Sequence, residues 1–334
     1  MPSPDRRGRP TVDEYERGVL AGDRTILGRA ITLVESNLPQ HREEAQQLLR
    51  RLLPHTGKAY RVGITGSPGV GKSTFIEVLG SELTREGHRV AVLAIDPTSS
   101  VSRGSILGDK TRMEALAKDP KAFIRPSPSG GSLGGVARKT RESLLVCEAA
   151  GFDVILVETV GVGQSETLVA EMVDCFVLLL LAGAGDELQG IKRGIIELAD
   201  LIAVTKADGD NAQRAQQAKV QSAAALRLVP PLSAHWKPRV VTVSAAEKKG
   251  IQALWSLIEE HRSCLCSVGE LTEKRRRQLL RWMWSMVEEG VMGDLRSHAE
   301  LAEQLPSLEQ RVLAGEATPT WAAERILEIF GARP

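Results

Sequence analysis

The sequence has few aromatic residues and no excess of charge of either sign. Phe, Trp and Tyr make up only 4% of its 334 residues, which leaves few platforms on which single-stranded nucleic acid could stack its bases. The 43 Lys and Arg residues are balanced by 42 Asp and Glu residues, so the basic excess typical of nucleic-acid binding proteins is missing. We therefore expect no nucleic-acid partner.

Long apolar runs and a dense set of cysteines are also missing. The longest apolar run, Cys175–Ala182, is far too short to cross a bilayer. Met1–Pro10 is polar and lacks the apolar core of a signal peptide; we expect a disordered tail, and a processed stub would have the same composition. Four cysteines are too sparse for a disulfide scaffold. These features predict a soluble cytoplasmic protein with no membrane partner, or a mitochondrial matrix protein if the chain is a trimmed eukaryotic form.

A short H-x-x-C-x-C cluster is formed by His261, Cys264 and Cys266. Imidazole and thiolate groups are ligands for soft metal ions. The cluster supplies only three ligands, at a point where a helix is predicted to end. Two interpretations stay open here: a metal site, and solvated residues at the end of a helix.

The chain begins with helical patterns and then changes character. Apolar residues recur at helical spacing from Thr11 to Asn37, and a second helix fits Arg42–Leu53, before Pro54. From Tyr60, short β-rich runs alternate with helical stretches. The runs are Arg61–Thr65, Arg89–Ile95, Ala122–Arg125, Val154–Val157, Cys175–Leu181, Leu201–Val204 and Val240–Val243. Strands separated by helices predict a mostly parallel sheet that is covered on both faces.

The remaining segments are predicted to be helices. Those between the strands are Ser73–Glu86, Gly135–Ala150 and Asn211–Arg227, and those after the last strand are Ile251–His261, Leu271–Gly290, His298–Leu313 and Thr320–Phe330. We therefore predict an α/β protein with a doubly wound, mostly parallel sheet. Its predicted parts are an N-terminal helical extension at residues 1–58, a domain containing the sheet at 59–262 and a C-terminal helical arm at 263–334.

A phosphate-binding motif lies between the first predicted strand and the helix that follows it. The glycines of a G-x-x-x-x-G-K-S pattern allow successive backbone N–H groups to converge on phosphate oxygens. Lys72 is expected to reach the β- and γ-phosphates, and Ser73 to offer its hydroxyl group to Mg²⁺. The nucleotide-binding residues predicted from this P-loop are Gly66, Ser67, Pro68, Gly69, Val70, Gly71, Lys72, Ser73 and Thr74.

Acidic residues follow two of the predicted buried strands. Asp96 comes directly after Arg89–Ile95, and Glu158 directly after Val154–Val157. Ligands of open α/β sheets bind at the carboxyl ends of the strands, so these carboxylates are candidates for a metal site beside the P-loop. Gly161 is expected to donate its N–H to the γ-phosphate, which would make the loop after it responsive to hydrolysis.

A base-reading motif follows the run Leu201–Val204. Thr205-Lys206-Ala207-Asp208 approximates the N-K-x-D motif of GTPases, with Thr in place of Asn. Asp208 would accept hydrogen bonds from the ring N–H and the exocyclic amine of guanine, and adenine has no such donor pair. Lys206 would lie along the base. Ser244, Ala245 and Ala246 match the loop that backs the guanine in GTPases, so the motifs together favour GTP over ATP.

Several longer strings closely resemble the MeaB/ArgK family of P-loop GTPases. They cover residues 66–74, Asp96–Ser100, Gly104–Met113, Phe123–Ser129, Glu158–Glu166 and Gly183–Lys192. The similarity runs from about Val12 to His261 and continues more weakly through the C-terminal arm. Thr205 in the base motif is similar to the form found in the animal mitochondrial branch, where GTP remains the nucleotide.

The resemblance implies a function, a cofactor and partners. Members of the family are G-protein chaperones of adenosylcobalamin-dependent acyl-CoA mutases, chiefly methylmalonyl-CoA mutase. They gate loading of the cofactor and protect the mutase from inactivation. We therefore expect GTP and GDP as ligands, Mg²⁺ as the cofactor, the mutase as a partner, and a homodimer formed through the C-terminal arm.

The resemblance also implies roles for individual residues. The metal set becomes Ser73, Asp96, Asp109 and Glu158, and the catalytic candidates are Lys72, Asp109, Gln164 and Lys192. Gly104–Met113 would be the first switch, Val160–Glu166 the second, and Asp186–Lys192 a mobile loop that faces the partner. Val162 stands where a water-orienting Gln is expected after Gly161, which leaves Gln164 and Gln189 as candidates. Slow intrinsic hydrolysis that the mutase accelerates is the resulting hypothesis.

Two other classes of enzyme use the same phosphate loop. An ATP-dependent kinase or transport ATPase would need a site that tolerates adenine, and Asp208 together with Ser244 argues against it. A nickel- or zinc-type metallochaperone GTPase would need a site of soft ligands for its cargo. The cluster of His261, Cys264 and Cys266 is the only candidate that the sequence offers for such a site.

Overall fold

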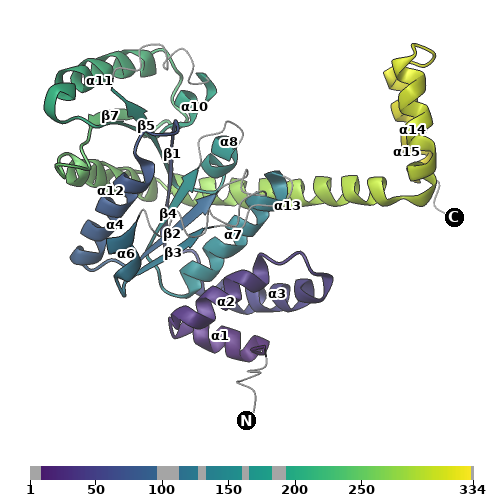
Figure 1. Ribbon diagram of the computed structural model, residues 1–334, viewed down its shortest axis with the longest axis horizontal. Coiled ribbons are helices and arrows are strands. Elements are labelled where there is room, and N and C mark those ends of the chain that lie inside the picture. Colours follow the sequence, from purple (N-terminus) through teal and green to yellow (C-terminus); the bar gives the residue numbers. More distant parts are fainter. Residues whose placement is uncertain (1–8, 96–112, 127–132, 160–164, 183–192, 332–334) are drawn as a thin grey trace, which may run out of the picture. The chain divides into compact units, whose positions relative to one another are not determined.

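A seven-stranded parallel sheet forms the centre of the protein (Figure 1). The computed structural model describes residues 9–95, 113–126, 133–159, 165–182 and 193–331. The strand order is β3-β2-β4-β1-β5-β6-β7, and each neighbouring pair is parallel. The strands are β1 (Tyr60–Gly66), β2 (Val90–Ile95), β3 (Ala122–Pro126), β4 (Val154–Thr159), β5 (Cys175–Leu181), β6 (Leu201–Thr205) and β7 (Arg239–Thr242). The predicted α/β sheet is confirmed, and the predicted strand bounds differ from these by at most two residues.

Successive strand residues pack against different layers of helices. In β2, Ala91 and Leu93 belong to a core with the N-terminal helices and α7, whereas Val90 and Val92 belong to a core with α4 and α12. Parallel strands that are buried on both faces are apolar at nearly every position, which is why the strands read as continuous apolar runs. The helices of the sheet domain are α4 (Lys72–Glu86), α6 (Glu114–Lys118), α7 (Leu133–Ala149), α8 (Ser165–Ala170), α10 (Arg193–Leu198), α11 (Ala212–Leu226) and α12 (Ile251–Ser267).

The N-terminal extension contains three helices, α1 (Val12–Leu20), α2 (Arg24–Val34) and α3 (Pro39–Leu52). The single helix predicted from Thr11 to Asn37 was therefore wrong, because the chain turns at Gly22, where φ is +72°. Asp23 then caps α2, since its carboxylate accepts hydrogen bonds from the backbone N–H groups of Thr25 and Ile26 at 2.8 and 3.1 Å. Helical spacing of apolar residues continues across the break, so periodicity alone does not reveal it.

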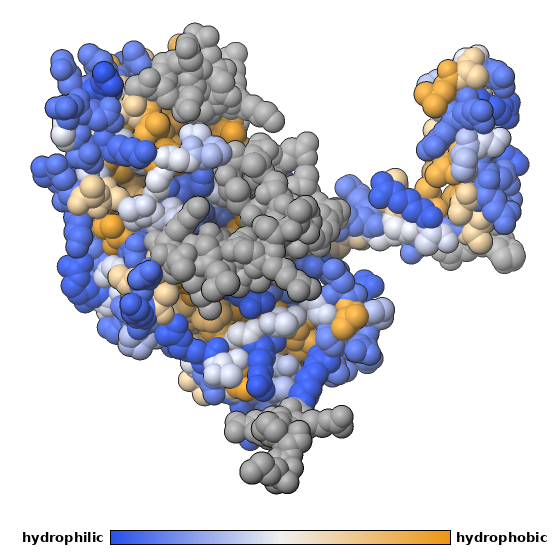
Figure 2. Space-filling model, in the orientation of Figure 1, coloured by the Kyte–Doolittle hydropathy of each residue, from blue (hydrophilic) through white to orange (hydrophobic). Residues whose placement is uncertain are grey.

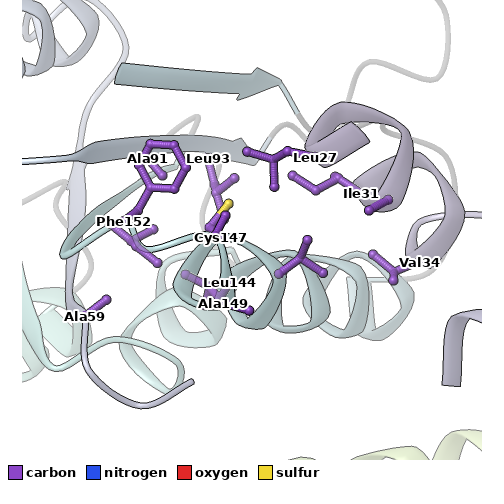
Figure 3. Close-up of a cluster of buried hydrophobic side chains, with 14 of the residues drawn as sticks. Leu27, Ile31, Val34, Ala59, Ala91, Leu93, Leu144, Cys147, Ala149 and Phe152 are labelled. Atoms are coloured by element: carbon purple, nitrogen blue, oxygen red, sulfur yellow. The ribbon is translucent and has the colours of Figure 1, made fainter. Parts of the chain in front are cut away.

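The extension is part of the main hydrophobic core. In Figure 3, Leu27 and Ile31 of α2 lie beside Leu144 and Cys147 of α7, and all four side chains are at most 1% exposed. Glu35, which caps the C-terminal end of α2, accepts a hydrogen bond from Arg125 Nη2 of β3 at 2.5 Å. The extension is thus joined to the sheet domain by apolar packing and by a partly buried ion pair.

The chain divides into two compact units at Gln278. The division falls inside α13 (Glu270–Ser297), so the first turns of this helix belong to the unit that contains the sheet. The second unit contains the rest of α13 together with α14 (Ala299–Leu313) and α15 (Pro319–Gly331), which pack side by side. Figure 2 shows hydrophobic residues among hydrophilic ones on the surface of this unit. None of the described helices has the length and apolar character needed to cross a membrane. The predicted functional boundary after residue 262 stays a prediction.

Hydrogen bonds of Arg275 connect the start of α13 to the rest of the sheet unit. Its guanidinium group donates to both carboxylate oxygens of Asp174, at 2.8 and 2.6 Å, and to the carbonyls of Gly57 and Ala59, both at 2.6 Å. The Asp174 side chain is fully buried. Arg275→Met is expected to lower the free energy of unfolding by about 3 kcal/mol, because it leaves a buried carboxylate without its charged partner.

Urea denaturation followed by circular dichroism measures this loss. Arg276→Met is the matched control, because the Arg276 side chain is 73% exposed and its change is expected to alter stability by less than about 0.5 kcal/mol. Equal stability of the two variants would show that the bonds made by Arg275 do not hold α13 in place.

Candidate functional site

The P-loop connects the end of β1 to the start of α4. Gly66 lies so close to β5 that an added Cβ atom would approach the Leu179 carbonyl oxygen to 2.5 Å. Gly71 precedes α4 in a left-handed conformation, with φ of +97°, and a Cβ atom there would meet nothing within 4 Å. The first N–H groups of a helix have no intrahelical partners, so the start of α4 offers donors for phosphate oxygens.

Lys72 is the first residue of α4 and is 9% exposed. Its ammonium group donates to the carbonyl oxygens of Gly66 at 2.7 Å and Ser67 at 3.1 Å. Burial lowers the pKa of Lys72, while the nearby carboxylates of Glu158 and Glu166 act in the opposite direction. Lys72 is therefore held inside the loop by polar groups. Glu166, 2% exposed at the start of α8, is an acidic neighbour that the sequence did not single out as a site residue.

Ser73 and Glu158 meet at the carboxyl ends of neighbouring strands. The Ser73 hydroxyl group donates to Glu158 Oε1 at 3.0 Å, and Glu158 is 7% exposed. The next residue of β4, Thr159, donates through its hydroxyl group to that of Thr65 in β1 at 2.8 Å. A hydroxyl and a carboxylate are oxygen donors of the kind that Mg²⁺ prefers, so this pair fits a magnesium site.

Thr205 links the base motif to the P-loop. Its hydroxyl group lies 2.8 Å from the Val70 carbonyl oxygen and 3.2 Å from that of Leu180. Thr205 is 5% exposed, so these contacts are shielded from water. The next residue, Lys206, has a φ of +53°, which few residues other than glycine adopt, and its carbonyl accepts a hydrogen bond from Asn211 Nδ2 at 2.8 Å. A hydroxyl group at position 205 can therefore tie the two nucleotide-binding segments together.

Asp208 is oriented by the loop that follows β7. The Ser244 hydroxyl group donates to Asp208 Oδ2 in a short hydrogen bond. The Ala207 N–H donates to the Val243 carbonyl at 3.1 Å, and the Glu247 N–H donates to Ser244 Oγ at 3.1 Å. The structure thus brings the T-K-A-D motif next to the S-A-A segment that contains Ala245 and Ala246, as a guanine pocket requires.

The P-loop, Glu158 and Asp208 all lie at the carboxyl ends of parallel strands, so they share one edge of the sheet. Six of the predicted residues lie outside the described part of the chain: Asp96, Asp109, Gly161, Gln164, Gln189 and Lys192. Their predicted metal-binding, γ-phosphate-binding and catalytic roles stay predictions.

The proposed cluster of His261, Cys264 and Cys266 does not assemble. His261 is fully buried, and its Nδ1 atom lies 2.5 Å from Tyr60 Oη. Cys264 Sγ contacts the His235 carbonyl at 3.2 Å, and Cys266 is exposed. The helix does not end at this point, because α12 continues to Ser267, and its turns direct the three side chains into different surroundings.

The contact between Thr205 and the P-loop predicts an effect on nucleotide affinity. Thr205→Val keeps the shape of the side chain and removes the hydroxyl group, so one buried carbonyl loses its partner. The affinity for GDP is expected to fall about tenfold, which corresponds to one buried hydrogen bond. Titration with a fluorescent GDP analogue measures the change. Thr205→Ser keeps the hydroxyl group and should bind within about twofold of the wild type; equal weakening by both variants would contradict the assigned contact.

Comparison with known proteins identifies the family of the chain. Residues 27–300 match the family described as "Methylmalonyl Co-A mutase-associated GTPase MeaB". A protein named "Probable GTPase" from Mycobacterium tuberculosis is 57% identical over 319 residues, which cover 96% of this chain and 95% of that protein. "GTPase ArgK" of Escherichia coli is 50% identical over 285 residues, covering 85% and 86% of the two chains.

Two further similarities extend along nearly the whole chain. "Methylmalonic aciduria type A homolog, mitochondrial" of Mus musculus is 48% identical over 332 residues, which cover 96% of this chain and 80% of that protein. A crystal structure titled "LAO/AO transport system kinase" superimposes with a TM-score of 0.81 at 38% identity and covers 98% of this chain and 100% of that one. The fold, the P-loop and these similarities lead to one conclusion: the chain is a P-loop GTPase of the methylmalonyl-CoA mutase-associated MeaB family.

Proposed function

We propose that this GTPase is the nucleotide-dependent chaperone of an adenosylcobalamin-dependent methylmalonyl-CoA mutase, and that it gates loading of the cofactor and protects the mutase from inactivation. The main support is the arrangement of one sheet edge. β4 carries Glu158 at its end and leads into residues 160–164, and β5 leads into residues 183–192. The second predicted switch segment and the loop predicted to face the partner thus follow strands that flank the P-loop strand β1 on either side. The description of the family names methylmalonyl-CoA mutase as the associated protein, which supports the choice of partner.

Mg²⁺ is the proposed cofactor. Ser73 and Glu158 supply the oxygen donors that the structure brings together, and Asp96 and Asp109 are the further candidates from the sequence. When bound, Mg²⁺ would neutralise negative charge that develops on the phosphates. Asp96, Asp109 and Glu158 have the carboxylates that this ion prefers, so the donor set fits a hard cation and not a soft one.

The residues of the chain itself supply binding and positioning. The N–H groups at the start of α4 would hold the phosphate oxygens. Lys72 would exchange the carbonyls of Gly66 and Ser67 for the β- and γ-phosphates, which keeps its buried charge balanced. Asp208, oriented by Ser244, would select guanine. Gln164 is the residue proposed to orient the attacking water. Lys192 is the catalytic residue proposed from the loop that faces the partner.

A homodimer is the proposed state of the free protein. In the second unit, four apolar residues of α13 recur at a spacing of three or four positions and are 45–59% exposed: Leu280, Trp284, Val287 and Val291. This spacing is the one by which two helices pair through a common seam. A second copy of the chain is the proposed partner of this seam.

Sedimentation of a double variant tests the dimer. Trp284→Glu with Val287→Glu places charge in the seam and is expected to shift the protein from dimer to monomer at micromolar concentration. The double variant Ser285→Glu with Met286→Glu adds the same number of carboxylates at exposed positions of α13 outside the seam and should remain dimeric. A wild type that sediments as a monomer would contradict the proposal.

A capture experiment tests the chaperone function. The purified chain is immobilised and incubated with methylmalonyl-CoA mutase in the presence of a non-hydrolysable GTP analogue, GDP or no nucleotide. We expect the amount of retained mutase to differ at least about tenfold between nucleotide states, because a switch must bind its partner differently in each state. Absence of binding in all three states would contradict the proposed function.

We propose the cytoplasm as the compartment, or the mitochondrial matrix if the chain is a eukaryotic form like the mouse relative.

A further inference from the structure

A second cluster of potential metal ligands lies at the amino-terminal edge of the sheet. Cys175 is the first residue of β5, Asp200 directly precedes β6, and His261 projects from α12. They are 0%, 7% and 0% exposed. One ligand atom from each lies within 4.8 Å of the other two. Because the strands are parallel, this edge is opposite to the one that carries Lys72 and Asp208, so the cluster is separate from the nucleotide site.

His261 presents an unpartnered nitrogen to this cluster. Its Nε2 atom is buried and makes no hydrogen bond. It lies 3.5 Å from Asp200 Oδ1, which is longer than the 2.7–3.2 Å of an ordinary N–H···O hydrogen bond. Ligands about 2.1 Å from a tetrahedral Zn²⁺ are about 3.4 Å apart. The separation between Nε2 and Oδ1 therefore matches two ligands of one ion better than it matches a direct hydrogen bond.

Neighbouring groups leave these two atoms free to bind a metal. Tyr60 Oη lies 2.5 Å from His261 Nδ1, so an Nδ1–H that donates to Tyr60 leaves the lone pair on Nε2. Asp200 Oδ2 accepts from the Phe176 N–H at 2.9 Å and lies 3.5 Å from Lys274 Nζ, which leaves Oδ1 for an ion. Bonds from the far side of a ligand commonly orient histidine and carboxylate groups in metal sites.

We propose that Cys175, Asp200 and His261 bind one Zn²⁺ ion, with water as the fourth ligand. Sulfur, nitrogen and oxygen donors together are typical of zinc, whereas Mg²⁺ takes oxygen ligands. Binding replaces the S–H bond of Cys175 by a bond between sulfur and zinc and releases the proton to the solvent. The thiol would have to move by about 1 Å at most to reach a tetrahedral position. The Lys274 ammonium group opposes a cation from the far side of Asp200, and the two anionic ligands offset it.

This ion would join α12 to β5 and β6, which are already paired with each other in the sheet. Burial raises the pKa of the Cys175 thiol, so the thiol stays protonated without a metal and binding should release one proton per ion. The proposal does not depend on the partner or on the chaperone function, since all three ligands lie in the described sheet unit.

Cobalt substitution provides a direct test. The full chain is treated with a chelator, saturated with Mg²⁺ and GDP to fill the nucleotide site, and titrated with Co²⁺, a spectroscopic substitute for Zn²⁺. We expect a band from charge transfer between thiolate and cobalt that saturates at one Co²⁺ per chain and that Zn²⁺ removes. Only a cysteine ligand produces this band, so cobalt bound at the magnesium site does not contribute to it.

Variants assign the band to its ligand. Cys175→Ser should abolish it. Cys147→Ser, which changes the other fully buried thiol, and the double variant Cys264→Ser with Cys266→Ser should keep it. Absence of this band in the wild type would overturn the proposal, whatever the variants show. A band that survives in Cys175→Ser and disappears in the double variant overturns it in favour of a site at the exposed cysteines.

Thermal denaturation provides a second readout that does not depend on colour. Zn²⁺ at about a hundredfold excess over its dissociation constant is expected to raise the Tm of the chelator-treated wild type by about 5 °C. The Tm of Cys175→Ser, measured on protein with a native circular dichroism spectrum, should not respond. Equal rises in the two proteins would show that zinc stabilises the chain elsewhere and would overturn the proposal.

Discussion

Replacing Lys72 by methionine is expected to lower the single-turnover rate of GTP hydrolysis by about 10²–10³-fold, the usual cost of removing one group that stabilises transition-state charge. Lys72 is the cation that the structure holds inside the P-loop, 2.7 Å from the Gly66 carbonyl and beside Glu158. Methionine keeps the length of the side chain and removes its charge. The variant also removes a cation close to the buried carboxylates of Glu158 and Glu166, so the rate is measured on protein with a native circular dichroism spectrum.

A matched lysine variant separates catalysis from a general loss of charge. Lys58→Met makes the same chemical change at an exposed position before β1, and its hydrolysis rate should stay within about twofold of the wild type. The rates are measured by quenching with excess enzyme over GTP, so that product release does not enter. A Lys72→Met variant with the wild-type rate would show that another cation stabilises the γ-phosphate.

Changing Asp208 to asparagine is expected to exchange the preferred base. The carboxylate can accept from the ring N–H and the amine of guanine, and two lost hydrogen bonds to a charged group correspond to at least about a hundredfold weaker GTP binding. Xanthine has a carbonyl where guanine has its amine, so the side-chain amide that the substitution introduces offers xanthine a matching N–H donor. XTP should therefore bind the Asp208→Asn variant more tightly than GTP does.

The test is a competition between GTP, XTP and ATP for a fluorescent GDP analogue. Asp210→Asn is the control, because Asp210 lies two residues away in an exposed turn and should keep the wild-type order of affinities. An Asp208→Asn variant that still prefers GTP would mean that Asp208 does not contact the base. Strong ATP binding by the wild type would favour the alternative of an ATP-dependent kinase or transport ATPase.

The sheet is well determined by sequence pattern, because parallel strands buried on both faces are continuous apolar runs. Cys175–Leu181 was predicted with its correct bounds, and the other strands within two residues. The break between α1 and α2 was missed, since Gly22 and Asp23 interrupt the backbone without interrupting the apolar spacing. The conformation of one or two turn residues determines such a break, whereas the spacing of apolar residues is a property of the whole segment and does not show it.

The candidate site shows the same contrast between local motifs and long-range contacts. The P-loop and the base motif are continuous strings, so their residue types and spacing predict a nucleotide site directly. The hydrogen bond from Thr205 to Val70 joins residues 135 positions apart. These residues come together only through the order of the strands in the folded sheet. Cys175, Asp200 and His261 likewise meet only in the folded chain. Sequence spacing instead grouped His261 with Cys264 and Cys266, whose side chains take different directions from one helix.

The measurement that tests the central claim most directly is single-turnover GTP hydrolysis with and without methylmalonyl-CoA mutase. If the chain is the nucleotide switch of this mutase, saturating mutase should raise the hydrolysis rate by at least about tenfold, because the partner orders groups that stabilise the transition state. The same addition should leave Lys72→Met near its basal rate. Equal rates for the wild type in the presence and absence of mutase would contradict the account.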